Sequence, residues 1–317
     1  MNSSVTSTTI STSSAASPVR ECTCHRCGKD YVAPVESRHR LLCGDSRKAA
    51  DMARLTNGRQ ADMAWCDPPY AVGIASRVGV GAGVSSSQAR AEGGKGIAND
   101  DLDVPQLTAF LREAFVLGLD ACKPGAVWYV AAPHGPMGVA FSVVLHELDV
   151  WHSSLVWVKD SLVISRLDYH YKHEVLYYGW KPGGAHHPVP DRTQTSVFEF
   201  PRPKRSEQHP TMKPVELVKK HIENSSDPGQ IIIDQFGGSG TTLIAAEQTG
   251  RNALLMEIDG RFCDVIVERW QEFSGRRAVR VAAGEAVVEG AATETIASEA
   301  AASEAVAVET GEEVACG

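Results

Sequence analysis

Apolar residues along the chain follow two patterns, which predict an alternation of strands and helices. In the first pattern they follow one another in short runs, as is typical of strands within a sheet. In the second they recur three or four positions apart, as is typical of a helix with one buried face. This alternation predicts parallel strands whose carboxyl ends meet at one edge of a sheet. The predicted strands are residues 40–43, 62–66, 126–131, 151–158, 230–234, 252–256 and 278–282, and the predicted helices are residues 47–55, 107–118, 138–148, 215–222, 241–249 and 262–270.

Two regions depart from this alternation. Residues 162–164 and 174–178 predict an antiparallel hairpin, which we place at the edge of the sheet. Residues 71–101 are rich in Gly, Ser and Ala and show no periodicity. A loop of this length inside a compact domain is usually functional or disordered. We therefore interpret it as a candidate lid over a site.

A rigid turn, Asp67-Pro68-Pro69-Tyr70, follows the run at residues 62–66. Two prolines end a strand because they lack N–H donors and fix φ. The turn presents the Asp67 carboxylate, the Pro68 carbonyl and the Tyr70 ring. Each oxygen can accept one hydrogen of an exocyclic NH2 group, and the ring can stack on a base, which contributes about 1–3 kcal/mol. The turn indicates a site for a flat, amino-bearing group, and the alternative is a surface turn without a function.

A second turn, rich in glycine, joins the run at residues 230–234 to a helix. Strand, glycine turn, helix, strand and acid is the layout of a nucleoside-binding half of an α/β sheet, in which Glu257 can accept ribose hydroxyls. The turn lacks the Gly-Lys-Ser/Thr of a phosphate loop and the third glycine of a dinucleotide turn. Asp234 would repel a pyrophosphate but suits a cationic ligand with an amino group. S-adenosylmethionine fits, and Lys213 could meet its carboxylate.

Asp45 follows the first predicted strand, so the same geometry brings it to the edge that holds Asp67. The alternative is that Asp45 only caps the following helix, for which Ser46 is the predicted N-cap. We retain Asp45 as a candidate ligand-binding residue.

Composition places the chain among soluble globular proteins, with 43% hydrophobic and 22% charged residues. No apolar run approaches the ~20 residues of a membrane span, and residues 1–20 lack the apolar core of a secretory signal. The formal net charge of -8 lies entirely in residues 284–317, which hold eight Glu and no Lys or Arg. Residues 181–221 instead hold eight Lys or Arg against four Asp or Glu. Local charge governs contact with phosphates, so this modest basic stretch fits a nucleic-acid partner.

Eight cysteines are scattered along the chain, which fits reduced thiols in a cytoplasm better than a disulfide framework. Cys24 and Cys27, followed by Gly28, form half of a zinc knuckle, and no second C-x2-C follows. Cys22 or His25 could complete a site, although ligands this crowded rarely reach tetrahedral geometry together. We therefore predict no metal site, and Cys22, Cys24 and Cys27 stay as a zinc-binding alternative to a thiol-bearing loop.

Together the motifs resemble the amino-group (N6-adenine/N4-cytosine) DNA methyltransferase family. Their order matches its permuted beta class, in which the catalytic motif precedes the cofactor motif. The residues that carry this resemblance are Gly44-Asp45-Ser46, Asp67-Pro-Pro-Tyr70, His209-Pro-Thr-Met-Lys-Pro214, Asp234-Gln-Phe-Gly-Gly-Ser-Gly-Thr-Thr242 and Glu257.

The resemblance implies a fold and a set of site residues. The fold is α/β: a Rossmann-like S-adenosylmethionine-dependent methyltransferase fold, circularly permuted, with a mostly parallel, doubly wound sheet and an antiparallel edge hairpin. The catalytic motif is Asp67, Pro68, Pro69 and Tyr70. The implied cofactor-binding residues are Asp45, Lys213, Pro214, Asp234, Phe236, Gly237, Gly238, Ser239, Gly240, Thr241, Thr242 and Glu257.

The resemblance also implies a reaction. A methyl group would pass from S-adenosylmethionine to the exocyclic amino group (N6) of a flipped adenine in double-stranded DNA. Asp rather than Ser at the first motif position favours adenine over cytosine N4, the main alternative. Further alternatives are methylation of RNA or of a protein glutamine, and a non-catalytic zinc-knuckle DNA-binding adaptor. The absence of a Pro-Cys motif argues against cytosine C5 chemistry.

The predicted organisation is a disordered, Cys-containing tail (1–37), a methyltransferase domain (38–283) and a disordered acidic tail (284–317). Within the domain we expect a catalytic half (38–180), a short target-recognition segment (181–208) and a cofactor half (209–283). The implied setting is a bacterial cytoplasm, for a bacterial or phage-encoded protein acting alone or in restriction–modification. A homodimer and a companion restriction nuclease both stay open, and no membrane partner is expected.

Overall fold

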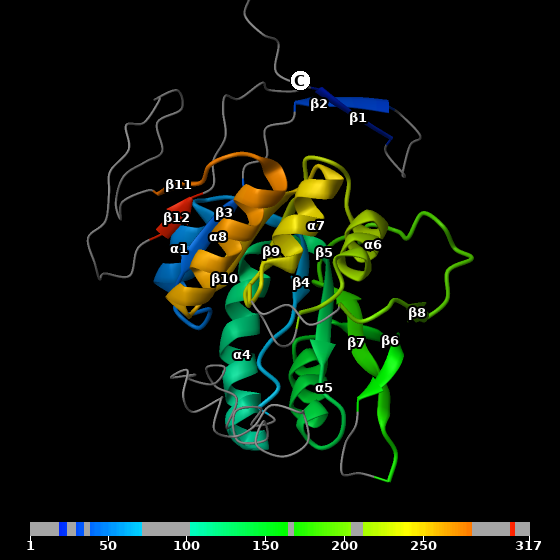
Figure 1. Ribbon diagram of the computed structural model, residues 1–317. Coiled ribbons are helices and arrows are strands. Elements are labelled where there is room, and N and C mark those ends of the chain that lie inside the picture. The colour runs from blue at the N-terminus through cyan, green and yellow to red at the C-terminus, as the bar shows by residue number, and fades with distance from the viewer. Residues whose placement is uncertain are drawn as a thin grey trace, which may run out of the picture.

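A mixed sheet runs through the centre of the protein in the computed structural model (Figure 1). The structure describes residues 19–23, 30–34, 39–71, 102–163, 168–203, 212–280 and 305–307. The middle strands of the sheet are parallel and lie in the order β3, β10, β9, β4 and β5. Strand β4, which comes early in the chain, therefore lies beside β9, which comes late. The strands are β3 (Arg40–Cys43), β10 (Asn252–Glu257), β9 (Ile231–Asp234), β4 (Ala61–Cys66) and β5 (Cys122–Ala132).

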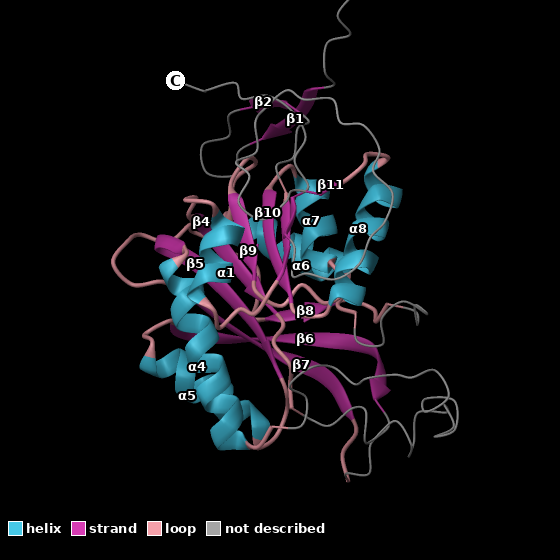
Figure 2. Cartoon of the chain, turned by 90° about the vertical axis from the view of Figure 1, so that its left-hand side faces the viewer, coloured by secondary structure: helices cyan, strands magenta, loops and turns pink. Residues whose placement is uncertain are grey.

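Helices cover both faces of this sheet, as Figure 2 shows from the side. Successive residues of a strand point to opposite faces. On β4, Ala64 and Cys66 pack with α1, α4 and α5, while Met63 and Trp65 pack with α6, α7 and α8. Burial on both faces explains the unbroken apolar runs and confirms the predicted doubly wound α/β fold. The helices are α1 (Ala49–Thr56), α4 (Val104–Asp120), α5 (Met137–Glu147), α6 (Val215–Ser225), α7 (Thr241–Thr249) and α8 (Gly260–Ser274).

An antiparallel hairpin lies toward one edge of the sheet, as predicted. Strand β7 (Tyr171–Trp180) pairs antiparallel with both β5 and β6 (Trp151–Val163). β8 (Val197–Glu199) then adds to β6 in parallel. The prediction of separate strands at 151–158 and 162–164 was wrong. The register shifts between Val158 and Val163, and such an irregularity lets one strand continue beyond the point where its apolar pattern breaks.

Helices α1 and α4 begin at residues other than those the pattern predicted, and side-chain contacts explain both differences. The N-cap of α1 is Lys48 and not Ser46, which is buried. The preceding turn is held by the Asp51 side chain, which accepts the Asp45 N–H at 3.0 Å. Helix α4 begins before residue 107, because Asp103 and Gln106 form a reciprocal capping box.

Three short strands lie within the terminal segments predicted to be disordered. β1 (Val19–Thr23) and β2 (Asp30–Pro34) form a separate antiparallel pair, and both contain β-branched residues that favour strands. β12 (Ala305–Ala307) pairs antiparallel with β3 and with β11 (Val279–Arg280). This uncharged triplet within a Glu-rich tail can add to the free edge of β3.

Several predicted features lie outside the described residues. These include the candidate lid beyond Ala71, residues 204–208 of the recognition segment, residues 209–211 of the His209–Pro214 motif, residues 281–282 of the last predicted strand, and both Cys24 and Cys27. None of the described helices combines the length and apolar character that crossing a bilayer requires.

Candidate active site

The two turns singled out in the sequence meet at one edge of the sheet. Asp67 directly follows β4 and Asp234 ends β9, and these two parallel strands are neighbours. The segment before α6 connects them. The Nζ of Lys213 lies 2.6 Å from Asp67 Oδ2. The backbone carbonyl of Lys213 accepts a hydrogen bond from the Thr241 hydroxyl at 3.4 Å. Residues more than 140 positions apart in the chain are thus in direct contact.

Burial governs the charge of Asp67. Desolvation raises the pKa of this carboxyl above its ordinary value, and the nearby Lys213 ammonium offsets only part of that rise. Lys213 is therefore the neighbouring group that favours the ionised form of Asp67. The Tyr70 ring packs edge-on against Phe141 with centroids 6.1 Å apart, and the ammonium of Lys213 lies 5.0 Å from the Tyr70 centroid.

Two charged residues that sequence reasoning missed complete this region. Glu174 on β7 accepts the Tyr70 hydroxyl at 3.3 Å through Oε2, and its Oε1 lies 2.6 Å from the Nζ of Lys159 on β6. Burial alone would raise the pKa of Glu174, but Lys213 and Lys159 outweigh it and lower that pKa to about 2. The available signal was weak, because other polar residues surround both charges in the sequence: Asp160 and Ser161 follow Lys159, and Lys172 and His173 precede Glu174.

The glycine turn is tied to the strand on either side of it. Asp234 Oδ1 accepts the Phe236 N–H at 3.0 Å, and Oδ2 accepts the Thr242 hydroxyl at 2.6 Å. Glu257 Oε2 accepts the N–H of Gly238 at 2.8 Å, which joins the turn to the end of β10. Asp234 is 2% exposed, and burial raises its pKa to about 7.

Glycine is required at the end of this turn. Gly240 has φ of 76°, and a Cβ there would lie 3.0 Å from the Ile266 side chain. Arg269, another residue missed by sequence reasoning, donates to the Ser239 carbonyl at 2.7 Å from α8. The backbone of the turn is therefore fixed from the side of α8.

Asp45 lies at the same edge and is held by Arg47. Both oxygens of Asp45 accept from that guanidinium, at 3.0 and 2.8 Å, and Arg47 lowers the pKa of Asp45. Arg47 also stacks over Phe110 at 5.2 Å, and Phe110 packs against Phe236 of the glycine turn. Asp45 does not cap α1, because the N-cap is Lys48.

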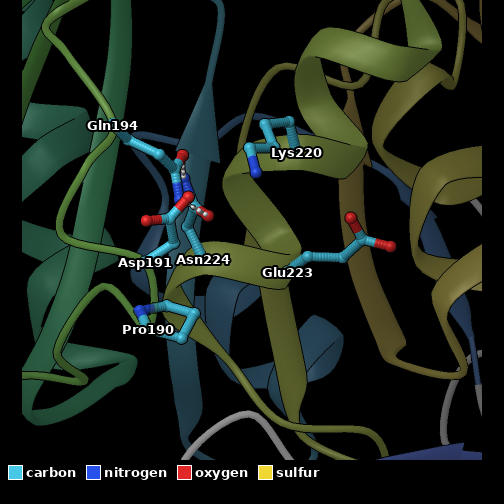
Figure 3. A pocket seen from close by; sticks show the side chains of 6 residues that line it. All are labelled: Pro190, Asp191, Gln194, Lys220, Glu223 and Asn224. Atoms are coloured by element: carbon cyan, nitrogen blue, oxygen red, sulfur yellow. Dashed lines mark hydrogen bonds between the residues drawn. The ribbon is translucent and has the colours of Figure 1, made fainter.

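The predicted recognition segment packs partly on α6, away from the residues above. Pro190, Asp191 and Gln194 face Lys220, Glu223 and Asn224 across a hollow of about 310 Å³ (Figure 3). The amides of Gln194 and Asn224 are reciprocally hydrogen-bonded at 3.1 and 2.9 Å. These contacts lie toward the C-terminal end of α6, whereas Lys213 precedes its N-terminal end.

The described residues do not form a metal centre, since they contain no cluster of three or more His, Cys, Asp or Glu able to hold an ion. Cys22 lies in β1, opposite Tyr31 in the separate two-stranded sheet.

Comparison with known proteins gives concordant matches. A family model described as DNA methylase matches residues 61–268. The putative methylase YubD of Escherichia coli (strain K12) is 30% identical over 215 residues, which is 63% of this chain and 78% of YubD. The DNA adenine methyltransferase YhdJ of Escherichia coli (strain K12) is 38% identical over 78 residues, so the match covers 23% of this chain and only 26% of YhdJ.

Among solved structures, the M1.HpyAVI-SAM complex has a similar fold. Its TM-score is 0.51 at 17% identity, over 72% of this chain and 98% of that one.

Proposed function

The chain belongs to the N6/N4 amino-group DNA methylase family, and from this premise we propose that it methylates the exocyclic amino group of a base in double-stranded DNA, with S-adenosylmethionine as the methyl donor. The observation that carries the proposal is the contact between the two turns. Lys213 bonds to Asp67 through its side chain and to Thr241 through its carbonyl. The groups suited to an amino-bearing base and those suited to the donor therefore lie at one edge of the sheet.

The residues around the glycine turn fit the donor. Glu257 would accept its ribose hydroxyls, Asp234 would face its ammonium group, and the glycines allow the backbone to approach closely. When bound, S-adenosylmethionine supplies a methyl group activated by a sulfonium. The M1.HpyAVI protein, which is similar in fold, carries SAM in its complex. The remaining cofactor candidates of the sequence, including Asp45, Lys213 and Pro214, stay proposals of this function.

The Asp67–Tyr70 turn would hold the base. A base must leave the duplex stack to be reached, at a cost of a few kcal/mol. Stacking on Tyr70 and hydrogen bonds from the amino group to Asp67 and to the Pro68 carbonyl offset this cost. Accepting both amino hydrogens favours a nitrogen lone pair directed at the methyl group, and positioning supplies the remaining rate enhancement. No covalent intermediate is required, and the methylated nitrogen becomes acidic and loses its proton.

We favour adenine N6 as the target. The first residue of the catalytic turn is Asp, and YhdJ, which is similar over part of this chain, is named as a DNA adenine methyltransferase. Methylation of cytosine N4 is the second candidate, because the family model covers both activities. The proposed DNA substrate is consistent with activity in a bacterial cytoplasm, the setting that the sequence resemblance implies.

The proposal is tested by incubating the protein with isotopically labelled S-adenosylmethionine and plasmid DNA. The DNA is then digested to nucleosides and analysed by mass spectrometry. We expect labelled N6-methyladenine, whereas labelled N4-methylcytosine would establish the second candidate. Absence of label in DNA, together with no cofactor binding by calorimetry, would refute the activity and favour a DNA-binding adaptor.

Replacing Asp234 with asparagine should stabilise the fold and weaken donor binding. The folded-state pKa of Asp234 is raised to about 7. The buried carboxyl is tolerated in its protonated, neutral form. Its contribution to the free energy of unfolding is therefore fully present below the pKa of the unfolded state, and it is lost as pH rises toward 7 and the folded protein must bury a charge. Asp234→Asn should be more stable than the unsubstituted protein at pH 8, on the order of 2–3 kcal/mol, with the difference shrinking toward pH 4.

Cofactor affinity should move in the opposite direction. In the unsubstituted protein, the affinity for S-adenosylmethionine should rise as pH passes through 7, because Asp234 becomes ionised. In Asp234→Asn the affinity should be about tenfold lower, because one charge-assisted hydrogen bond is lost. Thermal denaturation and calorimetry between pH 5 and 8 measure both effects. Unchanged affinity at every pH would remove Asp234 from the donor site.

A further inference from the structure

Two charged residues of the edge hairpin, Lys159 and Glu174, are buried beside the Asp67–Tyr70 turn. Their side chains are 8% and 16% exposed, and their charged atoms lie 2.6 Å apart. Charged side chains are rarely buried unless they are paired, and an incompletely paired one is costly. Neither residue belongs to a motif that supports the proposed function.

Glu174 reaches the turn through its second oxygen. Its Oε2 accepts the Tyr70 hydroxyl at 3.3 Å and lies 3.4 Å from Lys213 Nζ. Lys213 continues the row to Asp67 Oδ2 at 2.6 Å. Lys159, Glu174, Lys213 and Asp67 thus form a row of alternating charges that crosses from the edge hairpin to the catalytic turn.

We propose that Glu174, held by Lys159, is a positioning residue that fixes the Tyr70 ring and shares the Lys213 ammonium with Asp67, so that the ring and the Asp67 carboxyl group are correctly oriented to the base. This inference rests on the proposed function. Glu174 acts through Tyr70 and Lys213, and it need not touch the base, the donor or the reacting atoms.

The contacts of Tyr70 show why an anchor is needed. Phe141 meets the ring edge-on and Lys213 lies over the ring, but both contacts tolerate small rotations. The hydrogen bond to Glu174 fixes the hydroxyl end, and with it the plane on which a base would stack. A displacement of about 1 Å at such a site can lower a rate about 100-fold.

The row also sets the charge of Asp67. The charged or titratable groups around Asp67 come from each neighbouring element: Lys213 before α6, Glu174 on β7, Lys159 on β6, Tyr70 in the turn, Asp234 at the end of β9 and Cys66 on β4. Removing the negative charge of Glu174 should lower the pKa of Asp67. Removing the positive charge of Lys159 should raise it, because Glu174 then draws Lys213 away.

Three variants test these opposite signs: Glu174→Gln, Lys159→Met and the double variant. The pKa of Asp67 is read directly by NMR on protein with ¹³C-labelled aspartate, with Asp67→Asn to assign the signal. We expect shifts of about one pH unit, downward in Glu174→Gln and upward in Lys159→Met, with the double variant close to Glu174→Gln because Lys159 acts through Glu174. The acid limb of the pH–kcat profile should shift in the same order.

Activity gives the second readout. Glu174→Gln should lower kcat about 10- to 100-fold with little change in KM for S-adenosylmethionine. Glu147→Gln, which breaks the exposed ion pair with Arg112 between α4 and α5, is the matched control and should leave kcat unchanged. Folding of each variant is checked by thermal denaturation.

The possible outcomes separate this inference from the proposed function. Equal Asp67 pKa values in all three variants, or unchanged kcat in Glu174→Gln, would overturn the positioning role. Absence of methyl transfer by the unsubstituted protein would contradict the proposed function, while the NMR titration would still decide whether Glu174 and Lys159 control Asp67.

Discussion

Replacing Asp67 with alanine is expected to abolish methyl transfer while S-adenosylmethionine binding is retained. In the proposed reaction Asp67 accepts one hydrogen of the target amino group, and alanine removes that acceptor. Removing one such transition-state hydrogen bond typically costs about 10²–10³ in kcat, and loss of base orientation adds to this. We therefore expect at least a 1,000-fold lower rate, measured with labelled donor and plasmid DNA, and an unchanged donor Kd by calorimetry.

Asp67→Asn is the matched control for packing. It keeps the volume and one acceptor oxygen but removes the charge that pairs with Lys213. We expect an intermediate loss of rate, because asparagine can still accept one hydrogen bond. If Asp67→Ala methylated DNA at the wild-type rate, Asp67 could not hold the target amino group. Loss of donor binding in either variant would indicate a wider collapse of the site.

Much of the fold could be predicted because its strands are buried on both faces. A run such as Ile231–Asp234 carries an unambiguous burial signal, and parallel strands place their carboxyl ends on one edge without further information. That rule alone predicted that Asp67, Asp234 and Glu257 lie at one edge of the sheet, where the parallel strands end. The less buried edge hairpin gave a weaker pattern, and there one strand was predicted as two.

The contacts within the site could not be predicted, because they join distant parts of the chain. Tyr70 and Glu174 are 104 positions apart, and Lys213 and Asp67 are 146 positions apart. Hydrophobic periodicity contains no information about which charges pair. The predicted start of α1 was wrong for a different reason. Ser46 has the chemistry of an N-cap, but the chain continues for two more residues before α1 begins. Local propensity was overridden there by the turn that Asp51 holds.

The partners of Lys213 in the structure differ from the one predicted from its motif. From sequence it was a candidate partner for the donor carboxylate, whereas in the structure its ammonium bonds to Asp67 and Glu174. The ammonium lies between two partly buried carboxylates, which raise the pKa of Lys213 more than burial lowers it. A lysine held in this way stays protonated and controls the ionisation of Asp67.

Replacing Lys213 with methionine is therefore expected to lower kcat strongly near neutral pH and to restore part of it at higher pH. Burial already raises the pKa of Asp67, and Lys213 is the group that opposes this rise. Without the lysine, the pKa of Asp67 should rise further, so that less of the carboxylate is ionised at pH 7. We expect about a 100-fold loss in kcat at pH 7, with an acid limb displaced to higher pH.

The two roles of Lys213 predict different kinetics. If the lysine mainly binds the donor carboxylate, Lys213→Met should raise KM for S-adenosylmethionine and leave the acid limb of kcat in place. If it mainly controls Asp67, KM should change little and the limb should move. Lys219→Met on the surface of α6, where Lys219 pairs with Glu216, is the matched control and should alter neither quantity. Because removing one partner of a buried ion pair costs about 3–5 kcal/mol, the comparison is made below the denaturation midpoint of each variant.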